Sequence, residues 1–175
     1  GETTTAVIAN AGPGGVRATI PPGAKPDAAA FDPATGLVAV MDNAGGDIIL
    51  VDPKAGTAVG TIVVGGALEF GVVDGKGRLF VNVEDKNEIA VVDVAARKVT
   101  AHYPLPGCEE PSGLALDPAT GLLLAACSNK VAIAVKSKDG TIAATLAIGE
   151  RPDFALFDAA RKRFFLPCGE GKIAG

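Results

Sequence analysis

The fold is decided by the stretch Asp27-Ala28-Ala29-Ala30-Phe31-Asp32-Pro33-Ala34-Thr35-Gly36-Leu37-Val38-Ala39-Val40-Met41, in which a turn joins two short apolar runs. Each run is about five residues long, which suits a β-strand and is too short for a globular helix. Asp32-Pro33-Ala34-Thr35-Gly36 suits a tight hairpin, because proline presets φ at its second position and glycine accepts left-handed geometry at its close. The stretch therefore predicts two antiparallel strands.

Markers of this unit return about every 42 residues along the chain. Three series of markers keep this spacing, with steps of 41 to 43 residues. The series are Asp32, Asp74, Asp117 and Asp158; Ile20, Ile62, Tyr103 and Leu146; and Asn10, Asp52, Asp93 and Lys136. Four short strands in each repeat of ~40–45 residues is typical of a propeller blade. We therefore predict an all-β chain, a β-propeller of four-stranded antiparallel blades.

The repeat divides the chain into about four blades' worth of sequence, three complete blades plus two half blades. The predicted blades are approximately 1–24 (partial), 25–66, 67–109, 110–150 and 151–175 (partial), so that 1–175 is a single β-propeller domain or a fragment of one. Propellers close with roughly four to eight blades. Three arrangements stay open: a fragment of a longer propeller, a four-bladed ring in which the N-terminal strands complete the C-terminal ones, and a closed dimer of two halves.

Several short motifs carry a family resemblance. They are Pro26-Asp27-Ala28-Ala29-Ala30-Phe31-Asp32-Pro33 and Pro152-Asp153-Phe154-Ala155-Leu156-Phe157-Asp158, Ile48-Ile49-Leu50-Val51-Asp52 and Ile89-Ala90-Val91-Val92-Asp93, and Val59-Gly60-Thr61-Ile62-Val63-Val64-Gly65. In these the chain resembles the YVTN-type bacterial β-propeller repeat, of the quinoprotein amine dehydrogenase-like propeller superfamily. The tetrad that gives that repeat its name is degenerate here, as in Phe80-Val81-Asn82-Val83. The resemblance implies a propeller fold and export to the periplasm or the extracellular space of a bacterium.

The net charge and the apolar runs of the chain limit the kinds of partner that it is expected to bind. A net charge of −4 argues against nucleic acid or an anionic membrane, because both require a basic surface. No run of eighteen apolar residues occurs, so no membrane span is predicted. The partners that remain are an unknown protein or a small polar ligand, together with self-association or a missing remainder of the propeller.

The three cysteines are placed unevenly in the repeat. Cys127 and Cys168 end the second strand of successive blades, and Cys108 lies just before the innermost strand of the blade that contains Cys127. Because first and second strands are antiparallel, Cys108 and Cys127 should lie within disulfide reach, as a staple in an exported protein. The alternative is three reduced thiols. There is no C-x-x-C motif and only one histidine, so no metal site is predicted.

Aligning the units puts Asp27, Glu69, Ser112 and Asp153 in one slot, where each innermost strand begins beside the central channel. We predict that they form a ligand-binding ring at the channel mouth. Such a ring could take a cation or a polyhydroxylated ligand, since hard cations prefer oxygen donors. The alternative is that these residues only cap their strands by accepting backbone N–H bonds. The aspartates at the opposite end of these strands, such as Asp32, are interpreted as turn residues.

Catalytic residues are not predicted. His102, the single histidine, replaces a threonine of the outer strand and belongs to the blade rim, so neither a Ser-His-Asp nor a Cys-His set can be built at the axis. No cofactor is expected. The favoured function is an exported, non-enzymatic binding or scaffold module. The alternative is a propeller-based hydrolase (lactonase-like) or an oxidoreductase subunit with an axial site, because such proteins have a similar repeat pattern.

Overall fold

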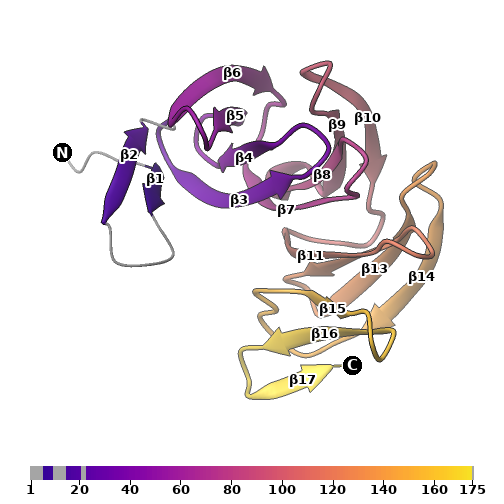
Figure 1. Ribbon diagram of the computed structural model, residues 1–175. Coiled ribbons are helices and arrows are strands. Elements are labelled where there is room, and N and C mark those ends of the chain that lie inside the picture. Colours follow the sequence, from indigo (N-terminus) through magenta and orange to yellow (C-terminus); the bar gives the residue numbers. More distant parts are fainter. Residues whose placement is uncertain (1–5, 10–14, 21–22, 175) are drawn as a thin grey trace.

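The computed structural model describes residues 6–9, 15–20 and 23–174, and strands dominate these residues. It contains 17 strands and one short 3-10 helix, Glu84–Lys86. The strands gather in sheets that follow one another along an arc (Figure 1). The prediction of an all-β chain is confirmed.

Three sheets have four strands each, and the strands of every one lie side by side in chain order. Blade 1 consists of β3 (Pro26–Asp32), β4 (Leu37–Asp42), β5 (Asp47–Asp52) and β6 (Thr57–Val63). Blade 2 consists of β7 (Leu68–Val73), β8 (Arg78–Val83), β9 (Glu88–Asp93) and β10 (Lys98–Pro104), and blade 3 of β11 (Pro111–Asp117), β12 (Leu122–Cys127), β13 (Val131–Lys136) and β14 (Ile142–Ala147). All neighbouring strands are antiparallel, so the predicted blade is confirmed.

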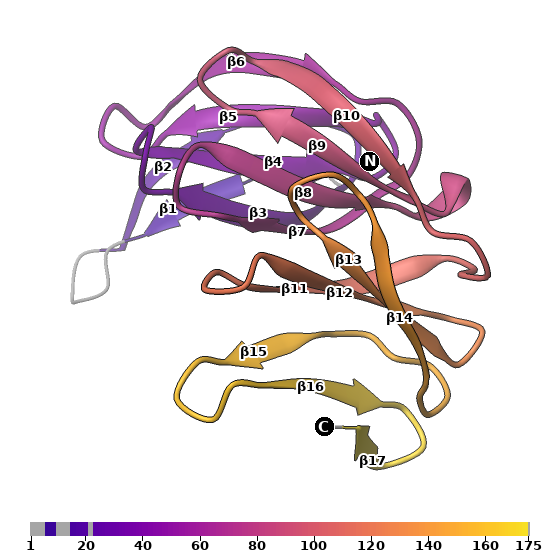
Figure 2. The ribbon, with the colours of Figure 1, turned by 90° about the vertical axis from the view of Figure 1, so that its right-hand side faces the viewer.

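Two smaller sheets lie at the ends of the arc. The N-terminal hairpin pairs β1 (Ala6–Ala9) with β2 (Val16–Ile20), and the C-terminal unit holds β15 (Leu156–Asp158), β16 (Arg163–Cys168) and β17 (Lys172–Ala174). These two sheets are separate, and Figures 1 and 2 place them far apart. The described residues therefore do not form the four-bladed ring in which the N-terminal strands complete the C-terminal ones.

The turn aspartates hold the hairpins between first and second strands. The Gly36 N–H donates to the Asp32 carbonyl at 2.8 Å, and Gly36 has φ +72°. The Asp32 carboxylate accepts the Thr35 hydroxyl at 2.8 Å. Asp117 accepts the Thr120 hydroxyl in the same way, at 2.6 Å. The interpretation of these aspartates as turn residues is therefore correct, with the side chain satisfying its own turn.

Blades pack through alternating side chains that bury both faces of each sheet. On β8, Leu79 and Val81 join the apolar cluster between blades 1 and 2, whereas Phe80 between them joins the cluster between blades 2 and 3. All three side chains are fully buried. Successive residues of a strand point to opposite faces of its sheet. A strand whose two faces both contact neighbouring blades therefore has apolar residues at consecutive positions. This explains why the middle strands carry no polar alternation.

The innermost strands lie side by side along the concave side of the arc. β3 contacts β7, β7 contacts β11, and β11 contacts β15. At the last of these contacts a Cβ on Gly113 would lie 2.7 Å from the backbone of Phe154, so only glycine allows the two strands to approach this closely. The concave wall is therefore built from four consecutive repeats.

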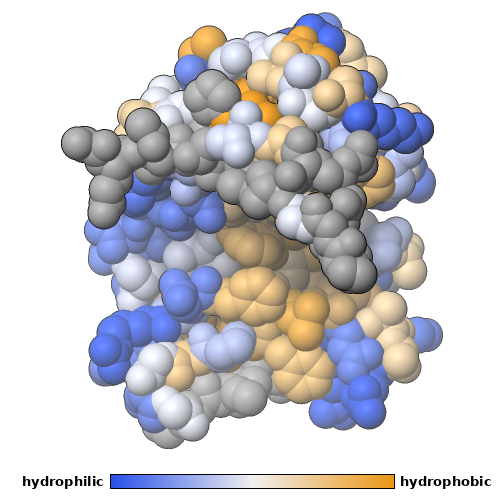
Figure 3. Space-filling model, turned by 60° about the vertical axis from the view of Figure 1, so that its left-hand side comes forward, coloured by the Kyte–Doolittle hydropathy of each residue, from blue (hydrophilic) through white to orange (hydrophobic). Residues whose placement is uncertain are grey.

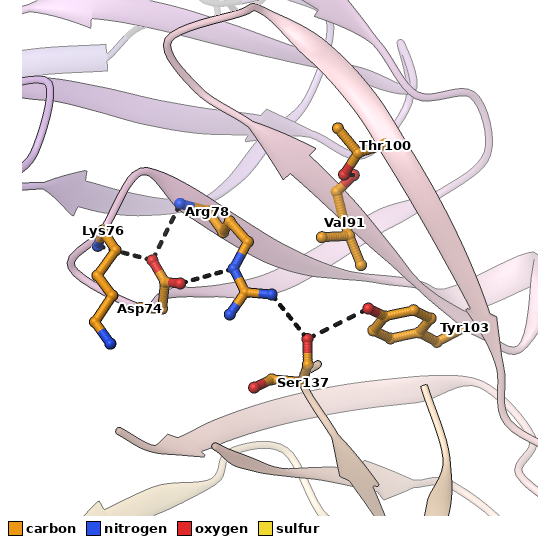
Figure 4. A network of polar contacts seen from close by, with 7 residues as sticks. All are labelled: Asp74, Lys76, Arg78, Val91, Thr100, Tyr103 and Ser137. Atoms are coloured by element: carbon orange, nitrogen blue, oxygen red, sulfur yellow. Dashed lines mark hydrogen bonds and ion pairs between the residues drawn. The ribbon is translucent and has the colours of Figure 1, made fainter. Parts of the chain in front are cut away.

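A polar network joins blades 2 and 3 at the end of the inner strands opposite to the slot (Figure 4). Arg78 donates from Nε to the Asp74 carboxylate at 2.8 Å and from Nη1 to the Ser137 carbonyl at 3.0 Å. The Tyr103 hydroxyl donates to the same carbonyl at 3.3 Å. Burial alone would raise the pKa of the Asp74 carboxyl, but the hydrogen bonds from Arg78 hold it below its ordinary value. Asp74 is thus engaged in blade packing.

A disulfide joins Cys108 to Cys127, with a Cα–Cα distance of 5.4 Å. It ties the segment that enters β11 to the end of β12, and both cysteines are buried among the side chains between blades 2 and 3. Cys168 is a free, buried thiol.

We expect the native chain, unfolded without reductant, to take up one alkyl group at Cys168, and three after reduction. Replacing Cys108 and Cys127 by alanine should lower the free energy of unfolding by about 3 kcal/mol, because the bridge closes a loop that spans 19 residues of sequence separation. Mass spectrometry and denaturant titration measure the two effects. Three alkyl groups without reduction would show that the bridge is absent.

Candidate functional site

The slot residues lie where the inner strands break their regular pairing. In each blade the pairing of the first strand with the second skips one or two residues of the first strand. The paired residues on either side of the skip are Pro26↔Asp42 and Ala28↔Met41 in blade 1, and Leu68↔Val83 and Gly71↔Val81 in blade 2. In blade 3 they are Pro111↔Cys127 and Gly113↔Ala126. Asp27, Glu69 and Ser112 fall within these shifts. A β-bulge leaves its extra residue out of the ladder and re-aims the side chain. Asp153 has the corresponding place in the C-terminal unit, directly after the isolated bridge between Pro152 and Cys168.

Two residues next to the slot have left-handed backbone. Glu110 has φ +48° and Arg151 has φ +51°, and each directly precedes a proline. Left-handed geometry in a non-glycine residue costs on the order of 1–3 kcal/mol and is found most often at functional sites. The Glu110 N–H is held by the Asn87 side chain at 2.8 Å, and the Arg151 guanidinium donates to the Gly169 carbonyl at 3.2 Å. The surrounding loops therefore hold this strained backbone in place.

Ser112 and Asp153 border one hollow of about 380 Å³ at the channel mouth. It is bounded by Glu84, Glu110, Ser112, Ser128, Arg151, Pro152, Asp153 and Gly169. The Ser112 hydroxyl donates to the Pro152 carbonyl at 2.7 Å, which joins blade 3 to the C-terminal unit. Asp153 is exposed to solvent. We call this hollow the mouth.

Asp27 and Glu69 meet in a carboxyl pair. Their side chains are hydrogen-bonded, and Glu69 also accepts the Asn43 side-chain amide at 2.8 Å. The pKa of Glu69 is raised to about 8, first by burial, then by the hydrogen bond and charge of Asp27, and further by the charge of Glu84, while Lys25 acts in the opposite direction. A raised pKa is expected when two carboxyl groups share a site, because both cannot ionise freely. At neutral pH the Glu69 carboxyl is therefore mostly protonated.

The four slot residues thus form two pairs, and Glu84 connects them. Glu84 borders the mouth beside Asp153 and also acts on Glu69. It lies in the short 3-10 helix Glu84–Lys86 that follows β8. Nothing in the sequence indicates that this loop reaches the channel mouth.

Capping of the inner strands is performed by other residues. The Asp42 carboxylate accepts the Lys25 N–H at 2.6 Å, and Asp85 accepts the Ala67 N–H at 2.8 Å. Lys25 and Ala67 lie directly before β3 and β7. The capping role considered for the slot carboxylates therefore belongs here to Asp42 and Asp85, which end or follow the second strands.

Beyond the mouth the inner strands line an apolar hollow, also of about 380 Å³, which we call the trough. Its lining residues are Ala30, Phe70, Gly71, Val72, Val73, Leu114, Ala115, Leu116, Phe154, Ala155, Leu156 and Phe157. Phe154 and Leu156 are 40% and 52% exposed, and the rings of Phe70 and Phe154 meet edge to face with centroids 5.2 Å apart. Figure 3 shows a hollow with hydrophobic residues between two hydrophilic borders.

The trough continues directly from the mouth. Glu69 precedes Phe70 on β7, and Asp153 precedes Phe154 at the entry to β15. On β3 the exposed positions are Asp27, Ala29 and Phe31, which share one face of the strand. Phe31 is 54% exposed. The phenylalanines of the trough, Phe70, Phe154 and Phe157, were not predicted from the sequence. Their places one to four positions after the slot were the available signal.

His102, the other residue considered for a catalytic role, lies away from the mouth and the trough. His102 contacts Glu88 at 2.8 Å between Nδ1 and Oε1, from strands β10 and β9 of blade 2. Among the described residues, no group of three or more His, Cys, Asp or Glu side chains is placed to hold a metal ion. The same residues include no helix with the length and hydropathy needed to cross a membrane.

Glu69 makes stability depend on pH in a definite direction. Its folded pKa lies above the ordinary value, so the folded chain binds the proton more tightly than the unfolded chain, and stability should fall as the pH rises from about 4.5 to about 8. One proton accounts for at most about 1.4 kcal/mol per pH unit, and for less where solvent screens the carboxyl.

We expect carboxyl ¹³C NMR titration to show Glu69 ionising near pH 8, and at a lower pH in Asp27→Asn, where burial still holds the pKa of Glu69 above its ordinary value. Glu69→Gln should flatten the fall in stability between pH 5 and 8. Glu88→Gln, at the rim of blade 2, is the matched control and should leave the titration of Glu69 unchanged. A wild-type Glu69 that ionises near pH 4.5 contradicts the carboxyl pair.

Comparison with known proteins shows the fold. No protein-family profile matches the chain, and no curated protein matches its sequence. The resemblance to the YVTN-type repeat therefore stays a prediction. Among solved structures the chain is similar to hydrazine synthase of Kuenenia stuttgartiensis, with a TM-score of 0.75 and 16% sequence identity.

The similarity covers 82% of this chain and 42% of the hydrazine synthase chain, so the present chain spans less than half the length of that protein. Structural similarity at this identity indicates a common architecture, but it gives no information about whether the two proteins share an activity. The fold recurs in 1048 chains of known structure, which further weakens any argument from fold to function. The chain has the blade architecture of a β-propeller.

Proposed function

We propose that this chain is a non-enzymatic binding module that takes its ligand on the concave wall of the inner strands. The observation that carries the proposal is the trough, an open apolar hollow that four consecutive repeats line and that leads to a carboxylate-bearing mouth. Its volume of about 380 Å³ lies within the range of roughly 300–1,000 Å³ typical of small-molecule sites. Exposed phenylalanine and leucine side chains on such a wall need a partner to remove them from water.

The backbone around the mouth supports the same proposal. Bulges at Asp27, Glu69 and Ser112 direct side chains out of the strand ladder, and strained residues flank the slot. Bulges and strain of this kind are retained where they position groups for a ligand.

A second candidate function follows from the carboxyl pair. A protonated carboxylic acid beside an ionised carboxylate is the arrangement that acid–base enzymes use. Glu69 and Asp27 fit that pattern, which favours the hydrolase alternative over the oxidoreductase subunit. The pair lacks a histidine, since His102 lies with Glu88 away from the inner strands. We therefore place binding first.

We also propose that the protein works outside the cytoplasm, in the periplasm or the extracellular space of a bacterium. The disulfide between Cys108 and Cys127 supports an oxidising compartment. The bacterial origin rests on the resemblance of the repeats alone.

Nile red, a neutral dye whose fluorescence rises in apolar surroundings, tests whether the trough takes a ligand. We expect the doubly substituted Phe154→Ser, Leu156→Ser chain to bind it several-fold more weakly than the wild type, because two partly exposed apolar side chains are lost from the trough. Val63→Ser is the matched control, since Val63 is 75% exposed on β6, away from the trough. Equal losses of Nile red affinity in the two variants would contradict the proposal. It would also be contradicted if the protein hydrolysed a lactone and Glu69→Gln abolished that activity.

A further inference from the structure

The trough and the mouth differ in chemistry, and together they specify a ligand more closely than either does alone. Every side chain that lines the trough is apolar. A polyhydroxylated ligand needs hydrogen-bond partners along its length, because each unpaired polar group that is buried costs free energy. The body of the ligand is therefore apolar.

The mouth is acidic. Three carboxyl groups border it, Glu84, Glu110 and Asp153, and the charge of Glu84 also acts on the carboxyl pair of Asp27 and Glu69. Two basic side chains accompany them, Lys25 and Arg151. Each of these is already engaged, Lys25 with the Asn43 side chain at 3.1 Å and Arg151 with the Gly169 carbonyl at 3.2 Å. The balance of charge favours a cationic group.

The apolar wall adds to this preference, because it is aromatic where it meets the mouth. Phe70 and Phe154 directly follow Glu69 and Asp153 in the chain. Aromatic faces attract organic cations, and the attraction grows when water is excluded. A bare metal ion would gain nothing from these rings, and the described residues offer no metal-binding group of three or more side chains.

We propose that the concave wall binds an amphipathic organic cation, with its apolar body in the trough and its ammonium group at the mouth. This inference rests on the proposed binding function and names the ligand class. The cation takes a place beside Glu84, Glu110 and Asp153 at the mouth, and its body lies along Phe70, Phe154 and Leu156. Along a strand, the five residues from Glu69 to Val73 span about 13 Å, which suits a ligand of one ring and a short chain.

The carboxyl pair gives this binding a second signature. A cation at the mouth stabilises the ionised form of Glu69, whose pKa is otherwise raised to about 8 by burial and by Asp27. Binding at neutral pH therefore releases a proton from the protein. A ligand that only fills the trough releases none.

Three isosteric probes test the proposal: 2-phenylethylammonium, neutral 2-phenylethanol and anionic phenylacetate. We expect calorimetry at pH 7 to give about tenfold tighter binding of the ammonium than of the alcohol, and weaker binding still of phenylacetate. Calorimetry in buffers of different ionisation enthalpy should reveal proton release with the ammonium alone. Ethylammonium, which lacks the ring, should bind at least tenfold more weakly than 2-phenylethylammonium.

Variants separate the two halves of the site. Asp153→Asn should remove most of the preference for the ammonium and leave the affinity for the alcohol unchanged, whereas Phe154→Ala should weaken both probes. Glu88→Gln on the rim of blade 2 and Val63→Ala on β6 are the matched controls and should change neither. Circular dichroism confirms that each variant is folded.

The outcomes distinguish this inference from the proposed function. Equal affinity for ammonium, alcohol and carboxylate, with Nile red still displaced by all three, overturns the cation preference and leaves the binding module intact. If none of the three probes binds and Nile red shows no binding in the trough, the cation preference and the proposed binding function are both overturned.

Discussion

Each complete blade buries apolar side chains on both of its faces, and this requirement organises the rest of the molecule. Leu79 and Phe80 illustrate it, since neighbouring positions of β8 serve opposite blade contacts. Fully burying one such side chain stabilises the fold by about 1.5–3 kcal/mol. Sheets packed in this way converge at their first strands, so that β3, β7, β11 and β15 come to lie side by side. The concave wall, and with it the trough, is a consequence of blade packing.

Where the same strands begin, the requirement for regular pairing is relaxed. The bulges free Asp27, Glu69 and Ser112 from the ladder, while Asp42 and Asp85 satisfy the backbone that leads into the strands. Carboxyl groups thereby gather at one end of an apolar hollow, where burial and mutual proximity raise the pKa of Glu69. At the other end the aspartates accept hydrogen bonds within their own turns, and Asp74 pairs with Arg78.

The blade was predictable from sequence because its determinants are local. A period of about 42 residues, five-residue runs and Asp-Pro-x-x-Gly turns identify the strands and their order. Alignment of the repeats also located the slot of Asp27 and Glu69. The trough was not predictable, because it depends on contacts between residues from different repeats, such as Phe70 against Phe154. The same holds for Glu84, whose loop reaches the mouth only in the folded arc.

The central claim is that the concave wall of the inner strands is the ligand-binding surface, and its most direct test is a map of ¹H–¹⁵N chemical-shift changes. The account predicts that 2-phenylethylammonium moves the amide signals of residues 27–31, 69–73, 112–116 and 153–157, on all four inner strands. Largest changes on β14, or in the turns that follow Asp32 and Asp117, would place the ligand elsewhere and contradict the account.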